Sequence, residues 1–436
     1  MATIPMDVAE VLKQLNSEGF QAYVVGGCVR DSLLGKAPHD WDVCTDALPN
    51  DIMRIFSYTI PTGIKHGTVT VLIGKTNVEV TTFRADGDYE DHRHPAEVHF
   101  VRSLEEDLAR RDFTVNAMAF SSEGQVLDYY GGREDLKNKI IRCVGDPDLR
   151  FQEDALRILR AMRFASVLGF SIDPETTRAM ARQAHLLKFV SAERIQSELR
   201  KMIIGPNVGS ILMNHKTPLL QILPEFTPCI GFEQHSVWHC WDVYTHIVQA
   251  VETSPEDELV RLALLFHDIG KPHCFTMDES GAGHFHGHGK ISAEVTDEIL
   301  KRLRFDNDTR ERVVKLVFNH DVRLEANLPT VRRWVRKIGR EDFARFLQIR
   351  KADILAQSEY ERSPRLEKCD KLDALYQEVL LEKPLMDVRD LALSGYDLME
   401  MGYQPGPEMG RILRSLLEKV LDGTCKNEKE ALKACL

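Results

Sequence analysis

The spacing of hydrophobic positions changes along the chain, and the change predicts a mixed α/β segment followed by a long helical one. Apolar residues first recur every three or four positions, at Val8, Val11, Leu12 and Leu15, and Gly19 follows them. This period is typical of an amphipathic helix that ends at a glycine. Short apolar runs then predict strands at residues 22–25, 39–44, 68–73 and 77–83. A turn at Gly74-Lys75 joins the last two strands.

From about Gly145 the helical period continues almost to the end of the chain. It predicts helices at residues 154–168, 192–204, 257–267, 291–303 and 344–356. Prolines interrupt the pattern and indicate a domain boundary, at Pro206, Pro218, Pro224 and Pro228. The expected fold class is α+β: a small α/β head with a mixed sheet, followed by a long all-α part.

Length and composition indicate a soluble cytoplasmic protein of several domains. At 436 residues the chain is too long for one hydrophobic core. No stretch approaches the roughly 18 apolar residues of a membrane span, and the first residues lack the layout of a signal peptide. The nine cysteines are scattered and never form a Cys-x-x-Cys pair, which favours reduced thiols over a disulfide framework.

The net charge of −11 does not favour RNA binding by the protein as a whole, but two segments are locally basic. Arg157, Arg160 and Arg163 recur every three residues and share one side of the helix predicted there. A second segment has eight basic residues against two acidic ones: Arg332, Arg333, Arg336, Lys337, Arg340, Arg345, Arg350 and Lys351. Each cluster predicts either a phosphate-binding surface or an ordinary solvated helix face.

Two aspartates, Asp40 and Asp42, lie two residues apart in the strand predicted at 39–44. Alternate side chains of a strand emerge on one face, so both carboxylates are expected to point to one place. Carboxylates that close repel each other unless cations lie between them. Two magnesium ions held by such a pair form the arrangement used for in-line phosphoryl transfer. Glu79, on a neighbouring predicted strand, is either a third ligand or an ordinary exposed strand position.

A glycine pair precedes these aspartates. Gly26 and Gly27 follow the strand at 22–25 and are followed by Arg30-Asp31 and a short apolar helix at 29–34. Glycines allow the backbone to approach an anion, and the first N–H groups of a helix point toward it. The segment therefore predicts a phosphate contact, to which Arg30 adds a charge. A purely structural turn would need the glycines but not the Arg-Asp pair.

These motifs resemble the active-site strand of the polymerase-β-like nucleotidyltransferases. They are most similar to the class II CCA-adding enzymes and their bacterial poly(A) polymerase relatives. Four further segments agree in order: Arg110-Arg111-Asp112-Phe113-Thr114-Val115-Asn116-Ala117, Gly131-Gly132-x-Glu134-Asp135-Leu136, Glu153-Asp154-x-x-Arg157 and Ser191-x-x-Arg194-Ile195-x-x-Glu198-Leu199. The resemblance, over residues 23–202, implies that they hold the ribose and triphosphate, close the head, recognise the base and brace the recognition helix. The nucleotide-binding residues expected are Gly26, Gly27, Arg30, Arg111, Asp112, Asn116, Glu153, Asp154, Arg157 and Arg160.

The segment Glu153-Asp154-x-x-Arg157 has a direct chemical interpretation. On a helix these three residues share one face. Cytosine and adenine each present an amino group beside an unprotonated ring nitrogen, which suits a carboxylate from Asp154 and a guanidinium from Arg157. Uracil and guanine would leave buried groups unpaired, so they are rejected. Glu153 would orient Arg157 by an i,i+4 pair, although such a pair is also an ordinary surface salt bridge.

Residues 85–107 are strongly polar and predict a mobile loop. The position resembles that of the flexible loop of complete CCA-adding enzymes, which favours addition of all three nucleotides over partial addition.

A second constellation follows in the helical part. His246 and His267-Asp268, the latter within an apolar Leu-Leu-Phe-His-Asp-Ile-Gly-Lys run, precede Asp353. This order resembles the HD phosphohydrolase superfamily, and the resemblance implies that the four residues bind a divalent transition metal or Mg²⁺. His288 and His320 are expected to complete a second site, and Asp321 is a rival for the distal carboxylate; His284 and His286 also lie nearby. The resemblance implies phosphatase or 2′,3′-cyclic phosphodiesterase activity that repairs tRNA ends, with Lys271 steadying the developing charge.

The expected function is addition of CCA to the 3′ end of tRNA from CTP and ATP, with Mg²⁺ in the head and no membrane partner. The expected domains are a nucleotidyltransferase head (1–140), a helical neck (141–205), a body with the HD metal domain (206–360) and a tRNA-contacting tail (361–436). Two alternatives stay open: a bacterial poly(A) polymerase, and an HD hydrolase or sensor with a vestigial RNA-binding head. The sequence does not indicate an oligomeric state.

Overall fold

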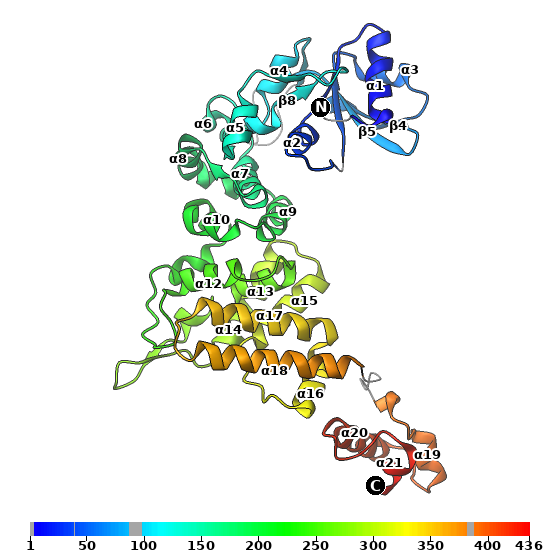
Figure 1. The fold of residues 1–436 in the computed structure, drawn as a ribbon, viewed down its shortest axis with the longest axis vertical. Helices are drawn as coiled ribbons and strands as arrows, with labels where there is room; N and C mark the ends of the chain where they lie inside the picture. The colour runs from blue at the N-terminus through cyan, green and yellow to red at the C-terminus, as the bar shows by residue number, and fades with distance from the viewer. Residues whose placement is uncertain (1–3, 39, 87–97, 382–387) are drawn as a thin grey trace. The chain divides into compact units, whose positions relative to one another are not determined.

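The computed structural model describes residues 4–38, 40–86, 98–381 and 388–436. It divides into two compact units, Met1–Pro224 and Glu225–Leu436 (Figure 1). The division falls among the prolines that the sequence analysis selected. A mixed sheet with helices forms the first unit and helices dominate the second, which confirms the α+β class. The finer division at 140, 205 and 360 stays a prediction.

The head is built on a seven-stranded sheet in the order β3-β4-β5-β2-β1-β8-β9. The strands are β1 (Ala22–Val25), β2 (Asp42–Thr45), β3 (Thr59–Gly63), β4 (Thr68–Ile73), β5 (Thr76–Thr82), β8 (Met118–Phe120) and β9 (Val126–Asp128). Strand β2 runs parallel to β5 and antiparallel to β1. The register pairs Asp42 with Val25 on one side and with Glu79 on the other. Two acidic residues therefore lie side by side at the start of β2.

Three of the four predicted strands form within a residue of their expected limits, as β1, β4 and β5. The second prediction began too early. Strand β2 starts at Asp42, Asp40 precedes it, and residue 39 lies outside the described residues. The ladder with β1 cannot extend further, because β1 ends at Val25 and Gly26 then turns the chain away with φ 85°.

Helices α1 (Met6–Ser17), α2 (Gly27–Leu33), α3 (Pro49–Ile55), α4 (Leu104–Ala109) and α5 (Gly132–Asn138) complete the head. The apolar stripe predicted for the first helix, including Val8 and Leu15, is fully buried in α1. Gly132 opens α5 against the η2 turn (Thr114–Asn116), where a Cβ would lie 2.2 Å from the carbonyl oxygen of Thr114. No other residue fits that approach, which explains the glycine of the motif.

The polar segment 85–107 is only partly the loop that its composition predicts. Its ends form the paired strands β6 (Arg84–Asp86) and β7 (Val98–Phe100), and α4 follows. Residues 87–97, which carry half of its ten charged residues, lie outside the described residues.

Six helices follow within the first unit: α6 (Pro147–Glu153), α7 (Leu156–Leu168), α8 (Pro174–Gln183), α9 (Ala192–Ile203), α10 (Val208–Asn214) and α11 (Lys216–Ile222). The parallel pair β10 (Ile140–Ile141) and β11 (Ser171–Ile172) joins them to the head. The predicted helix at 154–168 was wrong at its start. Asp154 is extended, with φ −141° and ψ 102°, and separates α6 from α7. Its carboxylate accepts a hydrogen bond from the N–H of Leu156 instead.

The second unit contains α12 (Val243–Glu252), α13 (Glu258–Phe266), α14 (His288–Arg302), α15 (Asn307–Asn319), α16 (Leu328–Ile338), α17 (Arg340–Ala356), α18 (Arg362–Leu381), α19 (Gly395–Glu400), α20 (Pro407–Leu421) and α21 (Lys429–Ala434). The short strands β12 (Thr276–Met277) and β13 (Gly283–His284) pair in the loop before α14. Helix α13 is the centre: residues 260–266 are all buried, and α12, α15 and α17 pack around it. Phe226 adds aromatic contacts to Tyr244 and Phe266. This buried helix positions the residues that follow it.

The last helices, α19 to α21, enclose a small apolar cluster of their own, which includes Leu393, Leu398 and Leu417. Among the described residues, no helix is long and apolar enough to cross a membrane.

Candidate functional site

The first candidate site lies at the start of β2, where three carboxylates approach one another. Asp42 is half-buried and pairs in register with the exposed Glu79, and Asp40 is exposed two residues earlier. Burial raises the pKa of Asp42, Arg111 opposes the rise, and the negative charges of Glu79 and Asp40 add to it. Acidic groups that interact in this way suit hard divalent cations, which relieve their repulsion.

Gly26 forms the wall of this site opposite the carboxylates. A Cβ at Gly26 would lie 3.2 Å from Nη1 of Arg111 and 3.4 Å from Oδ2 of Asp42. Because Gly26 has no side chain, space is left between the guanidinium of Arg111 and the carboxylate of Asp42. Arg111 is held from behind by the fully buried Asp107, whose Oδ2 lies 3.3 Å from its Nη2.

A chain of buried hydrogen bonds links α2 to α7. Nη1 of Arg30 donates to Oδ1 of Asn116 at 2.7 Å, and Nδ2 of Asn116 donates to Oδ1 of Asp112 at 3.0 Å. Arg160 then donates twice to Oδ2 of Asp112. Burial would raise the pKa of Asp112, but Arg160 and Asn116 hold it at about 2. Four residues predicted to bind nucleotide are thus brought together.

Arg30 is buried and already engaged. Besides Asn116, its guanidinium makes two bonds to Asp31, at 2.9 and 3.0 Å. Its predicted contact with phosphate therefore stays a prediction. The adjacent Gly27 lies beside it, since a Cβ there would be 3.5 Å from Nη2 of Arg30.

The residues predicted to recognise the base lie where α6 meets α7. Nη1 of Arg157 lies 2.5 Å from Oε2 of Glu153, as the pairing of these two residues predicted, although they belong to two helices rather than one. Arg157 also donates to the backbone oxygens of Arg150 and Arg110. Its guanidinium is therefore fixed in orientation.

Asp154 has a partner that the sequence analysis did not identify. Nη2 of Arg194, from α9, lies 2.7 Å from Oδ2 of Asp154. Further along the same helix, Glu198 accepts from Nε of Arg163 at 2.6 Å. The Ser-x-x-Arg motif was expected to brace this helix, and its two charged residues provide the contacts.

The basic face predicted on α7 is not a solvated surface. Arg157, Arg160 and Arg163 are buried or half-buried and each pairs with a carboxylate. Arg160 and Arg163 also lie over the ring of Phe164, at 5.3 and 3.7 Å. This face therefore holds the head and neck elements together, and the phosphate-binding interpretation of the cluster stays a prediction.

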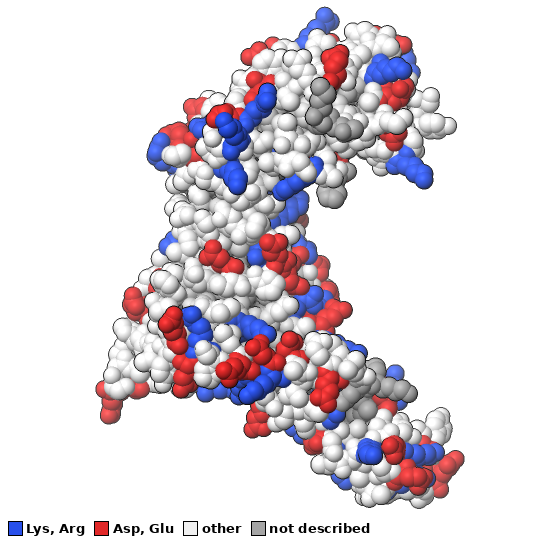
Figure 2. Space-filling view, viewed as in Figure 1, with Lys and Arg blue, Asp and Glu red and all other residues white. Residues whose placement is uncertain are grey.

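The basic segment 331–351 is likewise largely paired within the second unit. Arg333 contacts Asp422, Arg336 contacts Glu418 at 3.0 Å, and Arg345 contacts Asp257 at 3.0 Å. On the face shown in Figure 2, basic side chains alternate with acidic ones and do not form one continuous basic surface.

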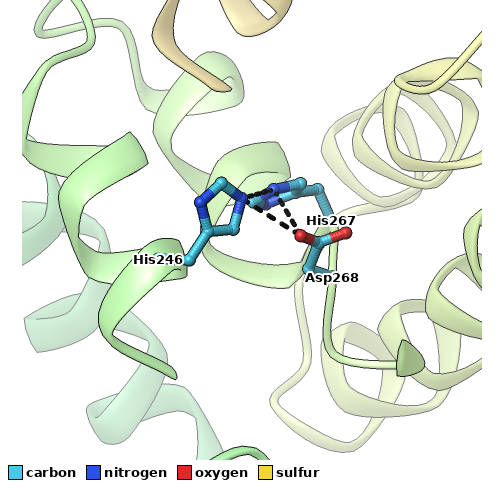
Figure 3. A group of neighbouring side chains, drawn as sticks. All are labelled: His246, His267 and Asp268. Atoms are coloured by element: carbon cyan, nitrogen blue, oxygen red, sulfur yellow. Dashed lines mark hydrogen bonds and ion pairs between the residues drawn. The ribbon is translucent and has the colours of Figure 1, made fainter. Parts of the chain in front are cut away.

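The second candidate site follows the buried helix α13. The Nε2 atoms of His246 and His267 lie 3.1 Å apart, and Oδ2 of Asp268 lies 3.1 and 3.2 Å from them (Figure 3). Asp353 of α17 adds a carboxylate oxygen 3.1 Å from Nε2 of His246. Metal–ligand bonds of about 2.1 Å at right angles put ligand atoms about 3 Å apart, so this spacing fits one cation.

Asp268 also faces a second pair of histidines. Its Oδ1 lies 3.3 Å from Nε2 of His288 and 3.6 Å from that of His320, and the two Nε2 atoms are 3.1 Å apart. The carboxylate thus presents one oxygen to each pair of histidines. Asp268 therefore belongs to both groups of side chains that lie close enough together to hold a cation.

The hydrogen bonds of the four histidines indicate the same tautomer for each ring. Each Nδ1 faces a backbone carbonyl oxygen: His267 faces Leu264 at 2.7 Å, and His288, His320 and His246 face Phe285, Val317 and Ala356. A carbonyl only accepts, so each Nδ1 carries the proton and each Nε2 offers a lone pair. Burial would lower the pKa of His267, but Asp268 and Asp353 raise it to about 10, so a proton occupies its Nε2 at neutral pH unless a cation replaces that proton.

Gly270 brings α14 to this site. A Cβ at Gly270 would lie 2.6 Å from the backbone nitrogen of Ser292, and the N–H of Gly270 donates to Oγ of Ser292. Because α14 begins at His288, this close approach places that histidine beside Asp268. The glycine of the His-Asp-Ile-Gly-Lys run thus has a structural reason.

The structure distinguishes among the remaining candidate metal ligands. Asp353 contacts His246, whereas Asp321 is exposed at the rim of the neighbouring cavity. His284 bonds to Asp278 and stacks on His286, and neither belongs to the two His–Asp groups that are close enough to hold a cation.

Lys271 is buried against the cluster, and its partners were not predicted. It donates to Oδ2 of Asp268 at 2.6 Å and to Oε1 of Gln234 at 2.8 Å. His239 lies 3.4 Å from the same amine, and burial together with Lys271 lowers its pKa to about 2. Gln234 and His239 precede the His-Asp run without a recognisable motif, so sequence spacing gave no signal for them.

Known families match three parts of the chain. Residues 22–142 match the poly A polymerase head domain, residues 169–230 match the RNA and SrmB binding site of polymerase A, and residues 285–436 match tRNA nucleotidyltransferase domain 2.

Individual proteins match almost the whole chain. A CCA-adding enzyme of Levilactobacillus brevis is 37% identical over 427 residues, which cover 98% of this chain and 96% of that protein. A CCA-adding enzyme of Enterococcus faecalis is 34% identical and covers 99% and 96%. The crystal structure of the Bacillus stearothermophilus CCA-adding enzyme in complex with CTP has a TM-score of 0.72 and 30% identity, over 99% of this chain and 97% of that one.

Proposed function

Because the chain belongs to the family of CCA-adding enzymes, we propose that Asp40, Asp42 and Glu79 hold the divalent cations of its nucleotidyl transfer. The enzyme adds C, C and A to the 3′ end of tRNA from CTP and ATP without a nucleic-acid template. The observation that carries the site assignment is the convergence of Asp42, Arg111 and Gly26 beside the two further carboxylates.

In this proposal the 3′ oxygen of tRNA forms a bond to the α-phosphorus, the bond from that phosphorus to the bridging oxygen breaks, and pyrophosphate leaves. The proton of the hydroxyl passes to water. Magnesium held by Asp40, Asp42 and Glu79 would supply positive charge to the triphosphate and would lower the pKa of the attacking hydroxyl. Arg111 binds the triphosphate from its fixed position against Asp107, and the bare backbone at Gly26 admits it.

Base selection rests on Asp154 and Arg157. Arg157 is held by Glu153 and two backbone oxygens, and Asp154 is held by Arg194, so both are oriented before a base arrives. A preorganised carboxylate and guanidinium accept the amino-bearing edges of C and A and leave U and G unpaired. Asp112 and Asn116, which bond to each other and to Arg160 and Arg30, would orient the ribose.

The test is incorporation of each labelled nucleotide into tRNA that lacks its CCA end. The wild type is expected to incorporate C and then A, but not U or G. Asp42→Ala should reduce incorporation by about 10³-fold or more, because the cation loses a ligand. Asp51→Ala, a surface carboxylate of α3, is the control. Extension of general RNA with ATP alone would favour a poly(A) polymerase, and full activity of Asp42→Ala would favour a vestigial head.

The second site supports a further activity. We propose that His246, His267, Asp268 and Asp353 bind one divalent cation and that Asp268, His288 and His320 bind another. Four buried Nε2 lone pairs converge on two carboxylates, a donor set that suits manganese, cobalt, nickel, iron or magnesium. Cations bound there would polarise a phosphoryl group and activate water. The site would then hydrolyse phosphoesters such as those at damaged tRNA ends, with Lys271 stabilising the developing charge.

This activity is separable from nucleotide addition. Wild-type protein should release 4-nitrophenol from 4-nitrophenyl phosphate or its diester once a divalent metal is added. His246→Ala should abolish the release and remove roughly one of the two ions bound at the His–Asp site. Asp42→Ala should leave the release and the ions of the His–Asp site unchanged. Retention of both ions by His246→Ala would contradict the ligand assignment. The free state of all nine cysteines agrees with action in the cytoplasm, which is part of the proposal.

A further inference from the structure

A cavity of about 510 Å³ opens over the His–Asp cluster of the second unit. This volume lies within the range of roughly 300–1,000 Å³ that is usual for small-molecule sites. Asp268, His288 and His320 line it, together with Asp353. The same cavity is also lined by basic residues from α17, α18 and the loop after α15: Arg323, Arg350, Arg365 and Lys368.

Three of these basic residues lie close enough to repel one another. Burial lowers the pKa of Arg365, the positive charges of Arg350 and Arg323 lower it further, and Asp353 opposes them. Nη1 of Arg365 and Nε of Arg350 are buried donors that have no hydrogen-bond partner among the described residues. Like charges held together with unused donors favour an anionic ligand.

Arg365 is linked to the His–Asp cluster through Gln357. Oε1 of Gln357 accepts from Nη2 of Arg365 at 2.5 Å, and Nε2 of Gln357 donates to Oδ1 of Asp353 at 2.8 Å. Asp353 in turn contacts His246. Gln357 is 8% exposed, so its buried amide separates the guanidinium of Arg365 from the proposed cation position beside Asp353. The guanidinium of Arg365 also packs over the ring of Trp238, 5.2 Å from its centre.

We propose that Arg323, Arg350 and Arg365 form a second phosphate subsite, so that the substrate of the His–Asp site is a nucleotide with phosphates on both the 3′ and 5′ sides of its ribose. The proposal rests on the hydrolase function proposed above. Neighbouring phosphates of a polyphosphate share one oxygen and are too close to reach both positions across Gln357. Phosphates on two sides of a ribose are far enough apart.

The reaction is hydrolysis of the 3′-phosphate ester. The oxygen of water forms a bond to phosphorus, and the bond from phosphorus to the 3′ oxygen breaks. That oxygen keeps the electron pair and takes a proton, which leaves a nucleoside 5′-phosphate and inorganic phosphate. The arginine subsite holds the 5′-phosphate and takes no part in bond breaking, so its residues act as specificity determinants.

The test compares adenosine 3′,5′-bisphosphate with adenosine 3′-monophosphate. Phosphate release by the metal-loaded wild type should show a KM about tenfold lower for the bisphosphate, since one charge-assisted contact is gained. Arg365→Gln and, separately, the exposed Arg323→Gln should remove that difference in KM, because the 5′-phosphate loses a charged contact. Lys371→Gln, on α18 outside the cavity lining, is the matched control. An unchanged KM ratio in both arginine variants would overturn the subsite.

Equilibrium dialysis of labelled bisphosphate against protein treated with EDTA gives a readout that needs no turnover. Wild type should bind it, and Arg323→Gln should weaken binding about tenfold. Binding without hydrolysis of either nucleotide would refute the hydrolase function but support the subsite, whereas hydrolysis of both with equal KM would do the reverse. An RNA oligonucleotide ending in a 3′-phosphate, run in parallel, shows whether the preferred source of the unit is an RNA end or the free nucleotide.

Discussion

Nε and Nη2 of Arg160 lie 2.8 and 2.6 Å from the same carboxylate oxygen of Asp112. The other oxygen of Asp112 accepts from Asn116 and from the N–H of Phe113. Asp112 belongs to the motif that is expected to hold the ribose. Its buried carboxylate is therefore paired with Arg160 of α7. The pair ties the position of the base-recognition helix to the geometry of the nucleotide site.

Removing the cation of this pair should destabilise the first unit. Arg160→Gln leaves a buried charge without its partner, for which the usual cost is about 3–5 kcal/mol. The Arg160 side chain is 34% exposed, so water compensates in part and we expect about 2–3 kcal/mol. Urea unfolding at pH 7 measures it. Arg178→Gln removes an exposed pair with Glu175, which water screens, and should cost far less. Equal costs for the two variants would mean that Asp112 is not held as the structure indicates.

The same pair predicts a dependence of stability on pH. The folded-state pKa of Asp112 is about 2, below its ordinary value of 3.8. The stabilisation is therefore complete well above pH 4 and is lost as the pH falls through 2. Between pH 6 and pH 3 the wild type should lose about 1 kcal/mol more than Asp112→Asn, whose amide does not titrate. Urea midpoints at the two pH values give the comparison, and parallel losses in both proteins would contradict the lowered pKa.

Arg194 should control nucleotide choice without touching the reacting atoms. It fixes the carboxylate of Asp154, so Arg194→Gln frees that carboxylate to rotate. We expect discrimination of CTP over UTP to fall about tenfold, while kcat for CTP changes less. Single-nucleotide incorporation kinetics measure the ratio. Lys201→Gln, on the exposed face of the same helix, should leave it unchanged. A variant with low activity but full selectivity would assign Arg194 a purely structural role.

Gly26→Ala should damage catalysis and stability together. The backbone at Gly26, with φ 85° and ψ −142°, is strained for any side chain by about 1–3 kcal/mol. The added methyl would also press on Arg111 at 3.2 Å. Displacing a triphosphate-binding group should reduce incorporation by about 100-fold. Gly35→Ala is the control. Gly35 also has a positive φ but has open space around it, so this change adds backbone strain without a steric contact. Equal activity losses in the two variants would show that the contact with Arg111 is irrelevant.

The sequence predicted what depends on local pattern. The apolar stripe of α1 and the strands β1, β4 and β5 were found because side-chain periodicity directly reflects which face is buried. The limit of β2 was missed, because it depends on where the partner strand ends at Val25 and not on the residues of β2. Likewise, Asp154 was assigned to a helix by periodicity, although its carboxylate satisfies the N–H of Leu156 as in a helix cap.

Pairings between residues far apart in the chain could not be predicted from the sequence. Asp154 and Arg194 are 40 residues apart, and no spacing rule joins them. The arginines on α7 look like a basic surface along one helix, but Asp112 and Glu198 come from other elements and neutralise them. The same holds for Gln357 and Arg365, which reach the His–Asp cluster only through the packing of α17 against α18.

Gly270→Ala tests whether close helix packing builds the second half of the His–Asp site. The added Cβ would lie 2.6 Å from the backbone nitrogen of Ser292, and backbone cannot yield as a side chain can. Helix α14 must then move outward and carry His288 away from Asp268, from which it is now 3.3 Å distant. Metal content after dialysis should fall from roughly two ions per chain to roughly one, because His246, His267 and Asp353 lie on other elements. Gly406→Ala, in extended backbone with nothing within 4 Å, should keep the wild-type content. Two ions bound by Gly270→Ala would mean that the approach of α14 does not place His288.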